Sequence, residues 1–139
     1  MPAPYKGQCL CGTIKYESDA FGAKMGHCHC SMCRKFHGSG FITLGEALLS
    51  DFRWVQGEAE LKSYTSENGV TRQFCRHCGS SMTFASAGSK SIELALGTLD
   101  SDLDIQPDAH IYVGSKANWT IISDDLPQYE SDRDSSRLK

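Results

Sequence analysis

Seven cysteines form three short groups in the 139-residue sequence, and their spacing is its most specific chemical feature. Cys9 and Cys11 form a C-x-C pair, and Cys75 and Cys78 form a C-x-x-C pair. Glycine follows each pair and tolerates the sharp turn of a metal knuckle. Two pairs supply four thiolates, which is a common ligand set of a closed structural zinc site. The spacing therefore predicts one structural zinc at these four cysteines, with free buried cysteines as the alternative.

The third group consists of Cys28, Cys30 and Cys33 within the segment HCHCSMCRK at 27–35. A tetrahedral zinc with three protein ligands keeps one position open, as catalytic zinc sites do. Three thiolates outweigh the charge of the ion, so this site favours a soft fourth ligand over hydroxide generated from water. An incoming thiol would bind as thiolate, the reactive form, and could attack a carbonyl carbon. The sequence predicts a catalytic zinc that activates a thiol.

The five histidines are weaker ligand candidates. His29 is the middle residue of a C-x-C pair, so its side chain is expected to point away from the metal and to lie behind the ligands. His27 and His37 remain open as direct ligands, His37 because it lies four residues after Cys33 on a short helix. His77 is expected to face solvent, and His110 to begin a strand.

Most of the remaining sequence consists of short β-type segments separated by glycine and polar turns. Strands are expected over 13–18, 39–45, 52–57, 60–66, 70–75, 81–86, 92–99 and 110–115. Asn68-Gly69 favours a hairpin between two of them. A short helix is expected over 31–38, with Ser31 as its cap and Gly38 at its end, and a second helical turn over 45–51. The predicted fold class is mainly β with one or two short helices.

Composition and charge exclude several classes of protein. The sequence has 40% hydrophobic residues and a net charge of −3, without the basic stripe of a nucleic-acid-binding protein. No window reaches the ~18 apolar residues of a membrane helix, and the N-terminus lacks an apolar signal core. We expect a cytoplasmic protein without membrane or nucleic-acid partners. Its length fits a single domain, placed at 1–130, followed by a flexible tail over 131–139.

Four segments together resemble a known family: GQCLCGTIKYE (7–17), CHCSMCRKFHGSGF (28–41), FCRHCGSSM (74–82) and HIYVGSKANWTIISDDLPQY (110–129). They are similar to the glutathione-dependent formaldehyde-activating enzymes, a family that includes centromere protein V. The resemblance implies a compact antiparallel, zinc-centred β fold similar to the Mss4-like fold, with the same division of the cysteines between two Zn²⁺ ions. It also implies a carbon–sulfur lyase that condenses formaldehyde with glutathione to S-(hydroxymethyl)glutathione. Another small thiol or carbonyl compound is the alternative substrate.

Glutathione has two carboxylates, which cationic side chains near the open zinc would bind. Arg34 and Lys35 directly follow Cys33, and an arginine can bind a carboxylate through two parallel hydrogen bonds. Arg34 and Ser39 are the predicted glutathione-binding residues, with ordinary surface positions as the alternative. Further candidates are Arg72, Arg76 and Lys116 as cations, Tyr112 and Trp119 as pocket walls, and Asp124 and Asp125 as acid or base.

A non-catalytic zinc-binding module is the alternative function. Such a module would carry a thiol or metal, or act as a redox switch in which Cys28, Cys30 and Cys33 release zinc and oxidise. If the protein is an enzyme, we expect Cys30→Ser to abolish thiol binding while the fold survives, because the other zinc stabilises the structure.

Overall fold

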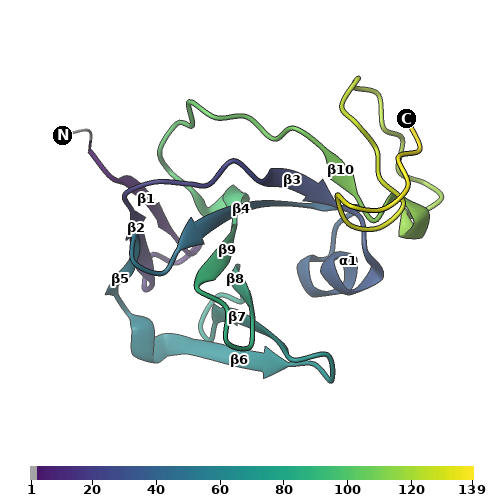
Figure 1. The fold of residues 1–139 in the computed structure, drawn as a ribbon. Helices are drawn as coiled ribbons and strands as arrows, with labels where there is room; N and C mark the ends of the chain where they lie inside the picture. The colour runs from purple at the N-terminus through teal and green to yellow at the C-terminus, as the bar shows by residue number, and fades with distance from the viewer. Residues whose placement is uncertain (1–2) are drawn as a thin grey trace. The chain divides into compact units, whose positions relative to one another are not determined.

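The structure, a computed structural model, describes residues 3–139 and is mainly β, as predicted. It divides into two compact units. Unit 1 comprises the residues up to Ala23 together with Gly45–Asp104, and unit 2 comprises Lys24–Leu44 together with Ile105–Lys139. The boundary falls within strand β4 (Ile42–Leu48), and Figure 1 shows the course of the chain through these elements. No helix among the described residues is long and apolar enough to cross a membrane.

Unit 1 contains most of the strands. They are β1 (Tyr5–Gln8), β2 (Lys15–Ser18), β5 (Phe52–Gln56), β6 (Leu61–Thr65), β7 (Val70–Cys75), β8 (Ser81–Ser86), β9 (Ser91–Ala95) and the second half of β4. One sheet has the order β1-β2-β5, and a second set has the order β4-β9-β8-β7-β6. The following neighbouring strand pairs are antiparallel: β1–β2, β2–β5, β6–β7, β7–β8 and β8–β9. Two 3₁₀ turns, η1 (Glu58–Glu60) and η2 (Leu96–Thr98), follow β5 and β9.

The predicted hairpin at Asn68-Gly69 is confirmed, because β6 and β7 pair directly across it. Gly69 adopts φ 82°, a conformation that side chains disfavour, and the Asn68 side chain accepts a hydrogen bond from the Val70 N–H at 3.3 Å. Val70 and Arg72 are buried, while Thr71 and Gln73, which alternate with them, are less so. This alternation fixes which face of β7 packs inward.

Tyr16 lies at the centre of the unit 1 core. Its side chain is fully buried beside Phe52 and Trp54, and its hydroxyl lies 2.8 Å from the hydroxyl of Thr98. A Cβ at Gly7 would collide with the Tyr16 ring, so only glycine fits at this point of β1. The tyrosine therefore positions the strands that flank the first cysteine pair.

Unit 2 contains β3 (Met25–Cys28), α1 (Ser31–His37), the first half of β4, β10 (His110–Ile111) and the 3₁₀ turn η3 (Val113–Ser115). The strand order is β10-β3-β4. β10 runs parallel to β3 and pairs His110 with His27 and Ile111 with Cys28. The yellow C-terminal segment in Figure 1 runs beside β10, where the Tyr129 N–H donates to the His110 carbonyl at 2.9 Å.

Residues 131–139 make backbone hydrogen bonds with the segment before them. The Leu138 N–H donates to the Gln128 carbonyl at 2.7 Å, and the Gln128 N–H donates to the Lys139 carbonyl at 2.8 Å. The division into a domain over 1–130 and a tail over 131–139 stays a prediction.

Three expected elements were wrong in type or length. The segment 45–51 is not helical: it forms the end of β4 and a turn, because Leu44 and Ala47 are buried in an extended chain. The strand expected over 92–99 ends at Ala95, where η2 begins. The strand expected over 110–115 ends at Ile111, because Tyr112 turns the chain with φ 58° and η3 follows.

The ends of other strands also differ from the expectation. The strand expected over 39–45 begins only at Ile42, as β4. β1 and β3 were not predicted, since YKGQ and MGHC are short and contain glycine in place of an alternating apolar pattern. Their pairing partners stabilise them.

Candidate metal centres and active site

The first cysteine cluster lies in unit 1 and is built from two tight turns. Cys9 and Cys11 lie in the turn between β1 and β2, and Cys75 and Cys78 lie at the end of β7 and in the turn before β8. The first turn is closed by the Gly12 N–H, which donates to the Cys9 carbonyl at 3.1 Å. The second is closed by the Gly79 N–H, which donates to the Cys75 carbonyl at 2.9 Å.

The predicted glycine turns are confirmed at both knuckles. Gly12 and Gly79 each have φ 79°, in the region that glycine favours. Backbone N–H groups point at the sulfurs: the Ile14 N–H lies 3.3 Å from Cys9 Sγ, and the His77 N–H lies 3.4 Å from Cys75 Sγ. Donors of this kind stabilise thiolates, as expected around a metal.

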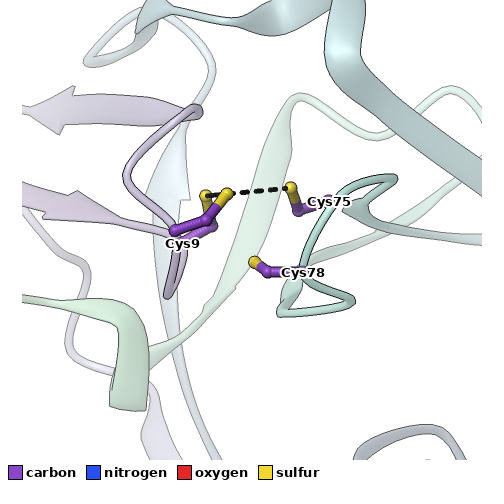
Figure 2. A group of neighbouring side chains, drawn as sticks. Cys9, Cys75 and Cys78 are labelled. Atoms are coloured by element: carbon purple, nitrogen blue, oxygen red, sulfur yellow. Dashed lines mark hydrogen bonds between the residues drawn. The ribbon is translucent and has the colours of Figure 1, made fainter.

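The four sulfur atoms converge on a common space. All lie within 4.8 Å of one another, with Cys9 Sγ 3.6 Å from Cys11 Sγ, and Cys11 Sγ 3.8 Å from Cys75 Sγ. Figure 2 shows Cys9 facing Cys75 and Cys78 across this space. A tetrahedron of sulfurs with zinc–sulfur bonds of about 2.3 Å has edges of about 3.8 Å. The donor set and its spacing therefore fit a tetrahedral thiophilic ion such as zinc.

Local hydrogen bonds decide which of these thiols ionise most easily. Burial opposes ionisation of Cys78, but hydrogen bonds from the Ser80 hydroxyl and from nearby backbone N–H groups outweigh it and lower its pKa to about 5. A hydrogen bond with the Thr13 hydroxyl lowers the pKa of Cys11. Burial raises the pKa of Cys75 to about 11. A bound cation would be needed to bring all four into the thiolate form.

The second cluster lies in unit 2, where β3 leads into α1. Cys28 is the last residue of β3, Cys30 caps α1 and Cys33 lies in its first turn. The Cys33 N–H donates to Cys30 Sγ at 3.2 Å, so Cys30 rather than the predicted Ser31 caps the helix. The Cys30 sulfur therefore accepts a helix N–H, the role that a Ser or Asp oxygen usually has at this position. The same sulfur belongs to the cysteine cluster. Gly38 ends the helix with φ 66°, as predicted.

The sulfurs of Cys28, Cys30 and Cys33 also lie within 4.8 Å of one another. Cys28 and Cys33 are buried against Leu44, with Ile111 and Tyr112 among the partly buried residues at the edge. Hydrogen bonds from the Cys28 and Cys33 thiols lower the pKa of Cys30 to about 2, and the same contact with Cys30 raises the pKa of Cys28. A divalent cation bound between the three sulfurs would favour the thiolate form of each. The trio fits a thiophilic ion with one coordination position left open.

Arg34 and Ser39, the predicted glutathione-binding residues, line one small cavity together with Lys35, Gly38 and Trp119. The cavity volume is about 160 Å³. Arg34 Nη2 donates to a backbone carbonyl of η3 at 3.2 Å, which orients the guanidinium. Its Nε is buried and has no hydrogen-bond partner among residues 3–139. Trp119 is 69% exposed and forms a wall, as considered from the sequence. The cavity therefore presents two cations beside an exposed aromatic ring.

Tyr112, the other proposed pocket wall, packs against the three-cysteine cluster instead. The remaining predicted cations are engaged elsewhere. Lys116 donates to two carbonyls of its own loop, at 2.6 and 3.3 Å. Arg76 lies 3.7 Å from Glu60, and Arg72 is buried in unit 1 over the Phe84 ring at 5.2 Å.

No histidine among the described residues joins either cysteine cluster. His27 Nδ1 lies 2.8 Å from the Thr43 hydroxyl, and the half-exposed His77 lies 3.1 Å from the Glu60 carboxylate. His37, in the last turn of α1, packs edge-to-face against Phe36. His29, the middle residue of the C-x-C pair, is not part of the cysteine group, and its Nε2 lies 2.8 Å from His110 Nδ1.

Sequence reasoning missed a hydrogen-bonded chain of three side chains in unit 2. His29 Nε2 lies 2.8 Å from His110 Nδ1, and His110 Nε2 lies 2.9 and 3.1 Å from the two Asp124 oxygens. Burial, with the nearby His110 ring, lowers the pKa of His29 to about 4. The sequence indicates Asp124 and Asp125 only as an acid or base, or as part of an exposed turn. Residues 29 and 110 are 81 positions apart, and no local spacing indicates that they meet.

Comparison with known proteins identifies the family. The profile of the glutathione-dependent formaldehyde-activating enzymes matches residues 4–115. A protein of Halomonas elongata, provisionally named as such an enzyme, is 27% identical over 125 residues, which are 84% of this chain and 80% of the relative. An uncharacterized lyase of Schizosaccharomyces pombe is 29% identical over 87 residues, which are 63% of this chain and 61% of the relative.

A solved structure has a similar fold. The crystal structure of a Rhodobacter sphaeroides protein is similar with a TM-score of 0.60 and 27% identity, over 71% of this chain and 91% of that one. The match of the family profile covers well over half of the sequence and includes all seven cysteines. The chain therefore belongs to the glutathione-dependent formaldehyde-activating enzyme family, as the resemblance of its cysteine segments predicted.

Proposed function

We propose that this protein is a carbon–sulfur lyase that adds glutathione to formaldehyde and releases S-(hydroxymethyl)glutathione. Family membership supports formaldehyde activation with glutathione, and the lyase name of a relative supports an enzyme of the lyase type. The observation that carries the proposal is the convergence of three sulfurs, from Cys28, Cys30 and Cys33, with no fourth protein ligand in the group. In the net reaction one carbon–sulfur bond forms, the carbonyl π bond breaks and the thiol proton ends on the new hydroxyl.

The two clusters would have different roles. Cys28, Cys30 and Cys33 would hold a catalytic zinc, which when bound supplies a cation that stabilises an incoming thiol as thiolate. Cys9, Cys11, Cys75 and Cys78 would hold a structural zinc whose four corners are filled. Two Zn²⁺ ions per chain are the proposed cofactors.

Arg34, Lys35 and Ser39 would bind the anionic part of the thiol substrate. Arg34 directly follows Cys33 in α1, and the thiol substrate would extend from the three-cysteine cluster to its guanidinium. The Ser115 carbonyl occupies one Nη2 hydrogen, which leaves Nη1 to donate to a carboxylate. No acidic side chain lines this cavity. These contacts would favour a thiol that carries a carboxylate over a neutral one.

The test combines native mass spectrometry with a formaldehyde-consumption assay on the full chain. We expect two zinc ions per chain, a glutathione adduct, and glutathione-dependent loss of formaldehyde faster than the uncatalysed addition. Cys30→Ser should lose one zinc, the adduct and the rate, while Ser31→Ala, which removes a neighbouring hydroxyl outside the cluster, should keep all three. Two zinc ions without adduct or rate would contradict the proposal and favour a non-catalytic zinc module. Loss of zinc and formation of a disulfide under mild oxidant would favour a redox switch.

A further inference from the structure

Asp124, His110 and His29 form a chain in unit 2 that the proposed thiol and metal binding does not use. The Asp124 side chain is 46% exposed, and the chain leads from it through His110 to His29, which is fully buried. The Leu126 N–H also donates to Asp124 Oδ1 at 3.1 Å, so a turn holds the carboxylate in place. An exposed carboxylate is thus linked, by hydrogen bonds alone, to the ring between two cysteines of the cluster.

The hydrogen bonds determine the tautomer of both rings. An ionised carboxylate can only accept, so His110 Nε2 carries its proton and donates to Asp124. When the His110 ring is neutral, its Nδ1 is then an acceptor, and His29 Nε2 donates to it. His29 Nδ1 therefore carries no proton, and it is buried without a hydrogen-bond partner among residues 3–139. Asp124 sets the orientation of two imidazoles in sequence.

The segment 109–111, which contains β10 and His110, also holds the backbone around His29. The His29 N–H donates to the Ile111 carbonyl and the His27 N–H donates to the Ala109 carbonyl, both at 2.9 Å. The His29 ring also packs on Phe41, with ring centroids 5.0 Å apart. The ring hydrogen bond with His110 thus adds a side-chain restraint to a backbone that β10 already pairs.

The three-cysteine cluster has special need of such a restraint. All three of its sulfurs come from one stretch of six residues, so no second segment of ligands clamps them from across the site. The separation of the Cys28 and Cys30 sulfurs depends on the conformation of the residue between them, which is His29. Partners behind the ligands of a metal typically change its affinity by about 10-fold to 100-fold when they are removed.

We propose that Asp124 and His110 are positioning residues for the three-cysteine cluster. They hold the His29 ring in one tautomer and one rotamer, and so keep Cys28 and Cys30 arranged to bind the same metal ion. The inference rests on the proposed function only in taking the cluster as a metal site. Measurements of the metal therefore test it independently of whether glutathione and formaldehyde are the substrates.

The decisive variant is Asp124→Asn, with Asp125→Asn as the matched control, because the control makes the same change of charge at the next residue. The full chain is loaded with ¹¹³Cd²⁺, and cadmium NMR separates the four-sulfur site from the three-sulfur site. We expect Asp124→Asn to shift or broaden only the three-sulfur resonance. A chelator competition should show about 10-fold weaker binding at that site. Asp125→Asn should match the wild-type protein in both measurements.

Nitrogen NMR of the zinc-loaded chain tests the tautomers directly. The wild-type protein should carry the proton on Nε2 of both His29 and His110, and Asp124→Asn should mix the two tautomers, which a merely structural change at an exposed turn would not do. Asp124→Glu, which keeps a carboxylate that can only accept, should restore the Nε2–H form and part of the metal affinity. The inference is overturned if His110 carries its proton on Nδ1 in the wild-type protein. It is equally overturned if Asp124→Asn binds cadmium within twofold of Asp125→Asn with an unchanged spectrum.

Discussion

The two cysteine clusters use the same ligand chemistry but are assembled by the chain in different ways. The cluster in unit 1 joins two turns, with Cys11 and Cys75 separated by 64 positions. The cluster in unit 2 comes from six consecutive residues, Cys28 to Cys33. A metal in the first cluster closes a long loop, so its binding energy is also folding energy. A metal in the second would fix only a short segment, and three sulfurs would leave one coordination position open.

Cys78→Ser should give the largest effect in this comparison. It leaves Cys75 as the single ligand from its turn in this group, which weakens the cross-link between the two turns and should cost several kcal/mol in the free energy of unfolding. The melting temperature should fall by about 10 °C or more, measured by circular dichroism. Cys30→Ser is the matched variant, and it should cost only about 1 kcal/mol. Equal losses of stability in the two variants would remove the distinction between a structural and a catalytic cluster.

Stepwise removal of metal should separate the clusters in the unmodified protein. A limiting amount of chelator is expected to take the ion from the three-cysteine cluster first, because it has three protein ligands against four. At one ion per chain the lyase activity should be lost while the far-ultraviolet circular dichroism spectrum is unchanged. Native mass spectrometry supplies the count of ions. Loss of β-structure together with the first ion would contradict this order.

Arg34→Ala should act on substrate binding without a loss of metal. Removing charge-assisted hydrogen bonds to a carboxylate should raise the KM for glutathione about 10-fold with little change in kcat. Lys24→Ala is the control, since this exposed cation of unit 2 lies outside the cavity. A glutathione diester, which lacks both free carboxylates, should show a smaller difference between Arg34→Ala and the wild-type protein. The same increase in KM for acid and ester would argue against a carboxylate contact.

The smallest effects are expected at the glycines that close the two cluster segments. Gly38 and Gly79 both have positive φ, and an added Cβ would meet nothing within 4 Å at either. Gly38→Ala and Gly79→Ala should therefore each cost about 1 kcal/mol of stability through backbone conformation alone. Urea denaturation of both variants measures this. A much larger cost at Gly79 would show that the knuckle geometry of the four-cysteine cluster is coupled to the fold more tightly than its turn alone requires.

The sequence by itself determined the features that depend on neighbours along the chain. The cysteine spacings, the glycines after them, the helix after Cys30 and the hairpin at Asn68-Gly69 all follow from residues a few positions apart. Local backbone preference decides such features before any distant contact forms. For this reason the division of the seven cysteines into two clusters, and the family, could be predicted from the sequence.

Tertiary structure decided what depends on distant pairing. The strand at 45–48 replaced an expected helix because burial in an extended chain outweighs weak helix propensity. The cavity beside α1 needs Trp119, and the His29–His110–Asp124 chain needs the parallel pairing of β10 with β3. Contacts between residues some 80 positions apart are selected by the packing of the whole unit, and no spacing in the sequence encodes them.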